Sequence, residues 1–352
     1  FSTKTTPVIF ELFTILNFFG FGRTPYIDGF EVPVNICIEI SSHALDQGRL
    51  NDIDWFNATS ILNISSDHLD YHKNISAYRD AKFEIFKNKS LVKLLDDKSY
   101  KLHHKYDFIV NDENKLLVIS KDNNFSDIYY EIKGISIKET IFEISINKPP
   151  KEYNFKERKK FKFCCNVFPD FNVHNLVFAI CSIGFGGFLE NKINDLNYLR
   201  LPKGRAEIIR DIPSNIIIDY AHNHEAIRLF LSSIKNQYDN LIVIIGCGGG
   251  RDKSKRSKML SAAIRDSSKV IFTSDNSRSE DFEDIFKDAA KNNNTENVVK
   301  IKDRKQAIIF GAKEISNNDC LVILGKGHEE TQEENNQISY FSDHEVVNEI
   351  YN

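Results

Sequence analysis

Five short apolar runs alternate with amphipathic stretches from residue 213 to the end of the chain. The runs are NIIIDY, LIVIIGCG, VIFTSD, NVVKI and CLVILGKG, and they are separated by stretches such as Glu225–Lys235 and Asp303–Ile315. Alternation of this kind predicts βαβ units that build a parallel sheet with right-handed crossovers. We therefore expect a Rossmann-like domain over residues 201–352.

Three glycine-containing, charged loops each follow one of these apolar runs directly. They are GCGGGRDKSKR (246–256), SDNSRSE (274–280) and GKGHEETQ (325–332). In an open α/β sheet the strands' carboxyl ends form one edge, and ligands bind there. The amides of GCGGG could form an anion-binding nest, and basic residues at a helix start are better tolerated if an anion is bound. The alternative for this loop is a tight strand-to-helix turn with an exposed basic first turn.

Two of these loops carry opposite charges that suit an amino acid. The guanidinium of Arg278 can bind a carboxylate in a bidentate manner, and Glu329 can accept hydrogen bonds from an ammonium group. Each motif alone is typical of an ordinary loop. Together they predict a site that binds both poles of an amino acid.

Residues 1–200 show a less regular pattern. Val34–Ile40 predicts a buried strand, and Ile75–Phe86 predicts a helix capped by Asn74 or Ser76. Alternating runs between 107 and 163 predict antiparallel strands, which we expect to form a small sheet of their own. Phe171–Phe185 predicts a second helix. We therefore expect a first domain, 1–200, with a mixed sheet, helices and a small antiparallel sheet.

The segment Asn63–Phe86 combines acidic, imidazole and amine side chains: Asp67, His68, Asp70, His72 and Lys82. With Glu39 they could form a cation site, and the alternative is a set of solvated turn residues. A lysine in such a helix usually extends to solvent, whereas one turned inward beside a metal would have a lowered pKa and could react as an amine. The residues by themselves favour the solvated alternatives.

Composition limits the classes of function. The 352 residues are 41% hydrophobic and 27% charged, with basic and acidic residues interspersed and a formal net charge of −4, so we expect two folded domains and no nucleic-acid partner. No apolar run approaches the roughly 18 residues that span a bilayer, so we expect a cytoplasmic protein with no membrane partner. We also expect a monomer. The six cysteines lack metal-type spacing and are expected to be reduced core residues: Cys37, Cys164, Cys165, Cys181, Cys247 and Cys320.

A series of motifs, in this order along the chain, resembles the Mur ligases of peptidoglycan synthesis and, among them, the diaminopimelate-adding type. The matching segments are TTP (5–7), EISSHALDQGR (39–49), SSDHLDYH (65–72), AYRDAK (77–82), FNVHN (171–175), GRAEII (204–209), DYAH (219–222) and the three glycine-containing loops. The resemblance covers essentially the whole chain. It implies a Mur ligase central domain followed by a Rossmann-like C-terminal domain.

The resemblance also implies roles for individual residues. Positions that match those holding the UDP-muramoyl substrate are Thr5, Thr6, Ser41, Gln47 and Arg49. Glu39 and His68 match magnesium ligands, and Lys82 matches a lysine that such enzymes carry as a carbamate beside a second Mg²⁺. Positions around ATP are Asn172, Asn175, Arg205 and Asp219, with Arg205 near the phosphates. Positions that select the incoming amino acid are Arg251, Asp275, Asn276, Arg278, Gly325 and Glu329.

The activity that the resemblance implies is ATP-dependent amide-bond formation. ATP phosphorylates the γ-carboxylate of the D-glutamate in UDP-MurNAc-L-Ala-D-Glu, and the amine of meso-diaminopimelate attacks the acyl phosphate. Catalysis would depend on Mg²⁺, Lys82, His68 and Arg205. Arg278 favours diaminopimelate over lysine because it can bind the second carboxylate that lysine lacks. The alternatives are a lysine-adding ligase, a folylpolyglutamate-type enzyme, and a non-catalytic or decayed relative with a binding or structural role.

Some features depart from the family pattern. No GxxxxGK[ST] occurs in the chain, whereas the resemblance implies a P-loop and a uridine-binding domain ahead of TTP. We therefore expect either a piece of a longer ligase or a decayed relative. DYAHNHEA replaces DYAHTPDA, and DNSR replaces DNPR, so that Ser277 gives a looser loop around Arg278.

Overall fold

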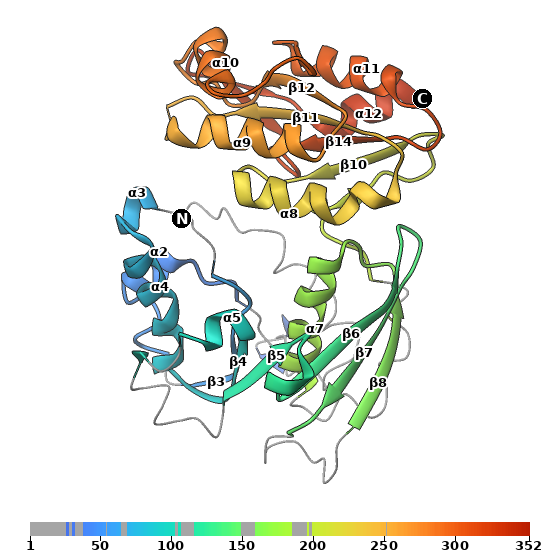
Figure 1. The fold of residues 1–352 in the computed structure, drawn as a ribbon. Coiled ribbons are helices and arrows are strands. Elements are labelled where there is room, and N and C mark those ends of the chain that lie inside the picture. Colours follow the sequence, from blue (N-terminus) through green and yellow to red (C-terminus); the bar gives the residue numbers. More distant parts are fainter. Residues whose placement is uncertain are drawn as a thin grey trace. The chain divides into compact units, whose positions relative to one another are not determined.

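The computed structural model describes residues 26–27, 30–31, 38–53, 55–64, 69–102, 105–106, 116–148, 159–184, 196, 199–250 and 252–352. The chain divides into two units, Phe1–Arg200 and Leu201–Asn352, and each is described by itself (Figure 1). Among the helices described, none has both the length and the apolar character that a bilayer crossing requires.

The first unit is built on one six-stranded mixed sheet. Its strands, in spatial order, are β3 (Trp55–Ile61), β4 (Lys89–Asp96), β5 (Leu116–Ser120), β6 (Ile128–Ile135), β7 (Thr140–Ile146) and β8 (Lys159–Cys165). β3 to β6 pair in parallel, and β6 to β8 pair antiparallel. The mixed sheet is confirmed. The expectation of a separate sheet for the strands after residue 107 is wrong, because Ile119 of β5 pairs with Ile128 of β6 and joins them to the parallel strands.

Burial differs between the two halves of this sheet. Every residue of β5 is buried, whereas β7 alternates buried and half-buried residues. Parallel strands covered on both faces read as continuous apolar runs, and antiparallel strands with one solvated face alternate. This difference explains why the sequence pattern changes within a single sheet. A short hairpin, β1 (Tyr26–Ile27) and β2 (Phe30–Glu31), precedes the sheet in the chain.

The helices of the first unit are short except for one. They are α2 (Ser42–Asp46), α3 (Leu69–His72), α4 (Ile75–Phe83), α5 (Asp97–Tyr100) and α7 (Asp170–Gly184), with 3₁₀ turns η1 (Glu84–Lys87) and η4 (Asn123–Phe125). Asn74 caps α4 as predicted, its side chain accepting from the Ala77 amide at 2.9 Å. The predicted helix is shortened, since η1 replaces its last turn. Ile38 to Ile40 are not in a strand and Ile38 is 51% exposed, so the predicted buried strand is wrong at its described end.

The second unit is a parallel sheet with one antiparallel edge strand. The spatial order is β13 (Val298–Lys300), β12 (Lys269–Ser274), β11 (Leu241–Cys247), β14 (Cys320–Leu324), β10 (Asn215–Asp219) and β9 (Glu207–Ile208). β9 alone runs antiparallel, to β10. The five predicted apolar runs are the five parallel strands, so the Rossmann-like fold is confirmed. β14 lies between β10 and β11, although it is the last of the five parallel strands in the chain. The strand order reverses at this point, and ligands of open α/β sheets bind at such a point.

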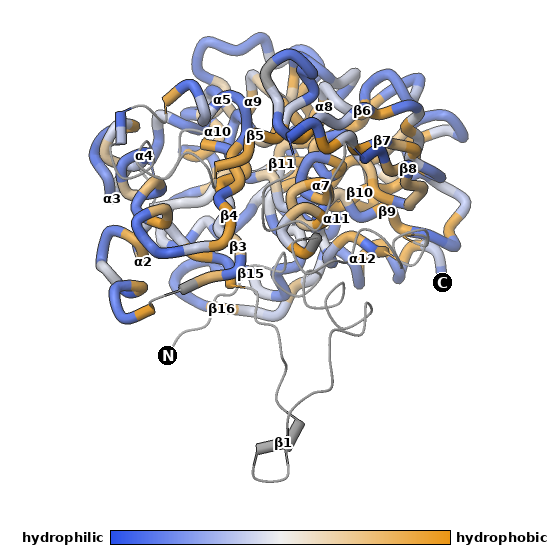
Figure 2. The backbone as a smooth tube through the Cα atoms, turned by 90° about the horizontal axis from the view of Figure 1, so that it is seen from below, coloured by the Kyte–Doolittle hydropathy of each residue, from blue (hydrophilic) through white to orange (hydrophobic). Residues whose placement is uncertain are grey.

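Helices cover both faces of this sheet. α8 (His224–Ile234), α9 (Ser254–Arg265) and α10 (Phe282–Ala290) lie on one face, and α11 (Arg304–Glu314) and α12 (Asp343–Tyr351) lie on the other (Figure 1). Hydrophobic residues are concentrated in the strands between these layers (Figure 2). A hairpin, β15 (Thr331–Glu334) and β16 (Gln337–Tyr340), follows β14.

One buried ion pair joins α11 to α12. Arg304 Nε donates to Asp343 Oδ1 at 2.7 Å, and both side chains are fully buried. Arg304 Nη2 also donates to the Leu324 carbonyl at 3.0 Å. The end of β14 is thereby fixed directly before the GKGHE loop begins.

Candidate functional site

Two loops meet at the carboxyl edge of the second unit's sheet. Asp275 to Arg278 follow β12, and Gly325 to Glu329 follow β14. Gln332 Nε2 donates to Ser274 Oγ at 2.9 Å, and the Glu333 amide donates to Asn276 Oδ1 at 3.0 Å. These bonds attach the start of β15 to the DNSR loop, so the two loops predicted to bind an amino acid are held together.

The side chain of Lys326 lies between these loops and is 0% exposed. Its Nζ is 3.3 Å from Asn276 Oδ1, 3.6 Å from Asp275 Oδ1 and 3.7 Å from Glu329 Oε2. The two carboxylate distances exceed hydrogen-bond length, so the ammonium attracts Asp275 and Glu329 without occupying their acceptor sites. The structure thus brings Asp275, Asn276 and Glu329 around a central residue that we had not assigned to the site.

Gly325 allows this close approach of the loops. Its φ is +109°, and a Cβ at this position would lie 3.2 Å from Asp275 Oδ2. A side chain would therefore strain the backbone and press on a carboxylate of the candidate site. The glycine that the family resemblance implies is required here by geometry.

Two of the three guanidinium nitrogens of Arg278 contact the protein. Nη1 donates to the Gly249 carbonyl at 2.8 Å and to the Asn276 carbonyl at 3.3 Å, and Nε lies 3.2 Å from Glu333 Oε2. The side chain is 27% exposed, so donors remain for a ligand. Glu333, which sequence reasoning missed, orients the group from β15. The Arg278 amide also donates to the Glu333 carbonyl at 3.0 Å, which fixes β15 beside the DNSR loop.

The glycine-rich loop after β11 does not offer the anion site that we expected. The Gly250 amide donates to Glu280 Oε2 at 3.1 Å, and the Gly249 amide donates to the Asn276 carbonyl at 2.9 Å. Glu280 also pairs with Arg256 and Lys253 at 2.6 and 2.7 Å.

The protein itself therefore supplies the anion at this loop. Hydrogen bonds from Arg256 and then Lys253 hold the pKa of Glu280 well below its usual range. Two of the four basic residues that we associated with a bound anion are occupied by this internal carboxylate. Arg251 lies outside the described residues.

Asp219 at the end of β10 binds backbone. Its carboxylate accepts from the amides of Ala206 and Ala221, both at 2.7 Å. Burial raises the pKa of Asp219, and these two hydrogen bonds and nearby Arg205 offset part of that rise. Asp219 therefore fixes the GRAE loop to the DYAH loop.

Arg205 lies over the ring of Tyr220. The guanidinium carbon is 4.4 Å from the ring centroid, a cation–π geometry. Tyr220 Oη in turn donates to Glu329 Oε1 at 3.3 Å. This contact connects the predicted phosphate-binding arginine to the predicted amino-acid loop.

The GRAE and GKGHE loops touch through their backbones. Gly204 has φ +67°, and a Cβ there would lie 2.2 Å from the Gly327 carbonyl carbon. A Cβ on Gly327 would lie 2.7 Å from the Gly204 carbonyl oxygen. Only glycine at both positions permits this contact.

In the first unit, α2 and α4 bring three predicted residues into one region. Ser41 caps α2, its Oγ accepting from the Ala44 amide at 3.2 Å, and Gln47 Nε2 donates to Tyr71 Oη at 3.4 Å. The half-buried Lys82 of α4 has its Nζ 5.5 Å from the Tyr78 ring centroid. Arg49 is exposed at the end of the same segment.

His72 links α3 to α2 in this region. Its Nε2 is 2.9 Å from Ser42 Oγ, and its ring lies 5.5 Å from that of Tyr78. His72 is buried, so it supports the helices and is not one of the solvated turn residues of our alternative interpretation.

The predicted metal ligands are described only in part. Glu39 is exposed, Lys82 is half-buried, and His68 lies outside the described residues, as do Thr5 and Thr6. Within the described part of the chain, no three His, Cys, Asp or Glu side chains are grouped as metal ligands. Assignment of Mg²⁺ to these residues therefore stays a prediction.

Asn172 and Asn175 lie at the start of α7 and bond to each other and to the backbone. Asn175 Nδ2 donates to Asn172 Oδ1 at 3.4 Å, and Asn172 Nδ2 donates to the Phe168 carbonyl at 3.1 Å. Between them, His174 has Nδ1 2.9 Å from Tyr130 Oη and Nε2 3.1 Å from the Leu62 carbonyl. Burial lowers the pKa of His174, so this histidine anchors α7 as a neutral ring.

The described cysteines are free thiols, and all but the half-buried Cys164 are buried. Burial raises the pKa of Cys181 and of Cys247 to about 12. Such thiols are inert as nucleophiles at neutral pH, as the prediction of reduced core residues requires. Cys37 lies outside the described residues.

Comparison with known proteins gives the same family for both units. The Mur ligase middle domain matches residues 33–183, and the Mur ligase glutamate ligase domain matches residues 204–327. A UDP-N-acetylmuramoyl-L-alanyl-D-glutamate–2,6-diaminopimelate ligase from Helicobacter pylori is 31% identical over 351 residues, which are 99% of this chain and 73% of the relative. The enzyme of that name from Wigglesworthia glossinidia brevipalpis is 33% identical over 333 residues, 90% of this chain.

Solved structures agree with these relatives. A structure of a ligase of the same name superimposes with a TM-score of 0.58 at 32% identity, covering 88% of this chain and 63% of that one. A MurF ligase from Thermotoga maritima in complex with ADP has a TM-score of 0.58 at 14% identity, covers 81% of this chain and 61% of that one, and shows the shared fold alone.

The chain spans 63% of the Wigglesworthia relative and 73% of the Helicobacter relative. The two family matches cover most of the chain, and they fall in the two units that the structure separates. The chain belongs to the Mur ligase family.

Proposed function

We propose that this chain provides the central and C-terminal domains of an ATP-dependent ligase that adds meso-diaminopimelate to UDP-MurNAc-L-Ala-D-Glu in cytoplasmic peptidoglycan precursor synthesis. The observation that carries the proposal is the gathering of Asp275, Asn276 and Glu329 around the buried Lys326, with Arg278 on the same loop as Asn276. The proposal is also supported by the relatives that are named as ligases of this kind.

The charges at this edge suit a zwitterionic ligand. Asp275 and Glu329 carry two negative charges against one positive charge on Lys326, so one negative charge is left for a substrate ammonium. Arg278 is already paired with Glu333 through Nε, and its remaining donors can bind a carboxylate. Diaminopimelate has an amino acid group at each end and can use both parts of the site, whereas lysine offers Arg278 no second carboxylate.

The reaction requires the amine to reach an acyl phosphate. ATP would phosphorylate the γ-carboxylate of D-glutamate, and Arg205, held over Tyr220, would stabilise charge on the phosphoryl oxygens. Asn172 and Asn175 would bind near the nucleotide, and Asp219 would hold the GRAE loop. Thr5, Thr6, Ser41, Gln47 and Arg49 would hold the UDP-muramoyl dipeptide.

Glu39, His68 and a carbamylated Lys82 would hold the Mg²⁺ that neutralises phosphate charge. Among them, Lys82 lies beside the buried Tyr78 on α4, a helix fixed to α2 through His72. This support would keep the Lys82 side chain from moving freely.

Calorimetric titration of the 352-residue chain with meso-diaminopimelate and with L-lysine tests the amino-acid assignment. We expect saturable binding of diaminopimelate, at least about tenfold weaker binding of lysine, and loss of this preference in Arg278→Ala, because one charge-assisted contact is worth about 1.5 to 3 kcal/mol. Equal binding of the two amino acids by the unaltered chain would favour a lysine-adding ligase instead.

A further inference from the structure

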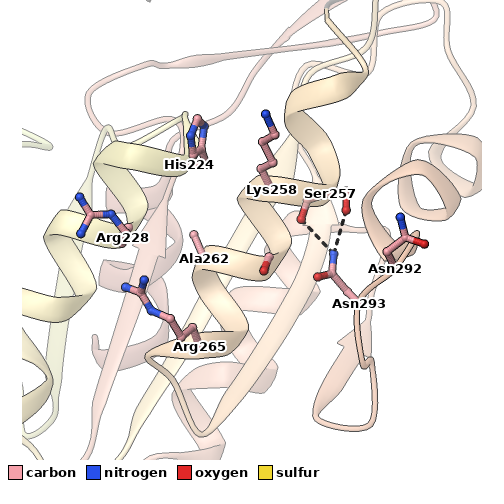
Figure 3. Close-up of a pocket in the computed structure, with 9 residues that line it drawn as sticks. His224, Arg228, Ser257, Lys258, Ala262, Arg265, Asn292 and Asn293 are labelled. Atoms are coloured by element: carbon pink, nitrogen blue, oxygen red, sulfur yellow. Dashed lines mark hydrogen bonds between the residues drawn. The ribbon is translucent and has the colours of Figure 1, made fainter. Parts of the chain in front are cut away.

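A surface cavity of about 370 Å³ lies on the second unit, where α8, α9 and the end of α10 meet (Figure 3). Four of the side chains that line it are basic and none is acidic: His224, Arg228, Lys258 and Arg265. Its volume falls in the range of small-molecule sites. The cavity shares no residue with the candidate amino-acid site.

The basic residues lie in two pairs on two different helices. His224 and Arg228 are four residues apart on α8, and Lys258 and Arg265 are seven residues apart on α9, so each pair lies along one helix face. Ala262 lies between the α9 pair and is buried. Its short side chain leaves the space between the two pairs open (Figure 3).

Two of these cations form no ion pair within the described residues. Arg265 pairs with Asp266, which also pairs with Lys235, whereas Arg228 and Lys258 form no ion pair with any described residue. Nδ1 of His224 is buried and has no hydrogen-bond partner in that same part of the chain. An anion bound in the cavity would supply the missing counter-charge.

Two helices begin at one end of the cavity. His224 is the first residue of α8, whose first turn also holds Glu225 and whose Ala226 amide is capped by Asn223. Lys258 is the fifth residue of α9, and Asp252, just before that helix, accepts from the Ser254 amide at 2.9 Å. Arg256 in that first turn pairs with Glu280 and Asp288, whereas Lys258 forms no ion pair with a described residue. The hydrogen bond from Ser254, and then the charges of Lys255 and Lys258, hold the pKa of Asp252 below its usual value. Positive side chains at a helix N-terminus oppose the macrodipole and favour a bound anion.

The lining indicates what kind of anion fits. Besides the basic residues it offers only hydroxyl, amide and methyl groups: Ser257, Ser261, Asn292, Asn293 and Ala262. No Phe, Tyr, Trp or branched aliphatic side chain is present on which a base or a lipid could pack. The basic pairs are separated by about 6 Å along α8 and about 10 Å along α9, which suits an extended anion rather than a single phosphate.

We propose that this basic cavity binds a chain of phosphoryl groups, as in inorganic polyphosphate or the triphosphate part of a nucleotide. Arg228 and Arg265 would bind one end of the anion, and Lys258 and His224 would bind the other. The proposal concerns a second anion site and does not depend on the ligase activity.

Calorimetric titration of the 352-residue chain with tripolyphosphate, without Mg²⁺ and at low salt, tests this site. The double variant Arg228→Gln/Lys258→Gln removes the two cations that form no ion pair, so folding should be preserved. We expect its dissociation constant to rise about tenfold or more, because charge-assisted contacts to the anion are lost. The matched control Lys287→Gln/Lys313→Gln, which removes two exposed cations outside the cavity, should bind as the unaltered chain does.

Two further ligands define the specificity. Orthophosphate should bind at least about tenfold more weakly than tripolyphosphate, because it reaches only one end of the cavity. ATP should show two binding steps. The double variant should weaken one step by the same factor as tripolyphosphate binding and leave unchanged the other step, at the proposed nucleotide site around Arg205, which would show that the cavity binds the triphosphate and not the nucleoside. Absence of saturable tripolyphosphate binding, or equal effects of the two double variants, would overturn the proposal. A loss in the cavity variant for tripolyphosphate alone would exclude a nucleotide as the source of the phosphates.

Discussion

At the residue scale, the buried ammonium of Lys326 determines how the amino-acid loops are arranged. It lies within 3.7 Å of an oxygen atom on each of Asp275, Asn276 and Glu329. Without this cation, two carboxylates would face each other at a poorly solvated position. Lys326 is thus a positioning residue for the groups that would contact the substrate.

Replacing Lys326 by Met should lower the free energy of unfolding by about 2 kcal/mol or more, because it leaves the two carboxylates without their compensating charge. Urea denaturation of both proteins measures this difference. Lys313→Met, at an exposed position of α11, serves as the control and should change stability by less than about 0.5 kcal/mol. The same stability for both variants would show that Lys326 does not hold the carboxylates. The Lys326→Met variant should also bind diaminopimelate more weakly while it remains folded.

Lys82 permits a second test at this scale. If it acts as a carbamate, Lys82→Ala should abolish ligation, and excess bicarbonate should not restore it because the alanine has no amine to carboxylate. Product formation is measured by mass spectrometry. Lys87 is an exposed residue that follows Lys82 in the chain and pairs with Glu84. The control variant Lys87→Ala should therefore keep its activity. Full ligation by Lys82→Ala would contradict the assigned role.

At the element scale, the GRAE loop, the GKGHE loop and α12 form one supporting structure. Gly204 and Gly327 meet through their backbones, and Gly204 N donates to Glu207 Oε2 at 2.6 Å. Glu207 also contacts His344 of α12, whose Nε2 lies 2.6 Å from Oε2. The position of the candidate site therefore depends on elements outside the three predicted loops.

Substitution of Gly204 by Ala should destabilise the second unit by about 2 kcal/mol or more. The new Cβ would lie 2.2 Å from a backbone carbon, at a φ of +67° that alanine rarely adopts. Gly134→Ala is the control, because a Cβ there meets nothing within 4 Å. Thermal unfolding of the two variants measures the difference, and a Gly204→Ala protein as stable as the control would contradict the close approach of the loops.

The Glu207 contacts predict a pH dependence. Burial alone would raise the pKa of Glu207, but hydrogen bonds from His344 and the Gly204 amide lower it below its usual 4.5. A carboxyl group with a lowered pKa stabilises the fold above its unfolded-state pKa, and this contribution is lost as the pH falls through the folded-state pKa. Glu207→Gln should therefore lose less stability than the unaltered protein when acidified from pH 6 to below pH 4.5, measured by urea denaturation at each pH. Parallel losses in both proteins would exclude this linkage.

At the scale of the whole molecule, sequence patterns predicted the strands better than the contacts between them. Buried runs such as LIVIIGCG have the length and composition of parallel strands, so β10 to β14 are confirmed. The pairing of β5 with β6 could not be predicted, because a strand at the junction of parallel and antiparallel halves has no distinct composition.

The candidate site was predicted from its loops, but its interior was not. Asp275, Asn276 and Glu329 follow strand ends, which share one edge. Glu333 and Glu280 take their partners from distant segments, so their roles depend on tertiary packing. The predicted anion nest is wrong, because the Glu280 carboxylate accepts from an amide of the same glycine-rich loop.

The measurement that tests the central claim most directly is the mass of the product formed by this 352-residue chain from UDP-MurNAc-L-Ala-D-Glu and MgATP, with meso-diaminopimelate and L-lysine supplied together. We predict a product whose mass corresponds to the diaminopimelate adduct, with little or no lysine adduct. A lysine adduct as the main product would contradict the assigned role of Arg278. No product with either amine would mean that the chain is an incomplete or a decayed ligase.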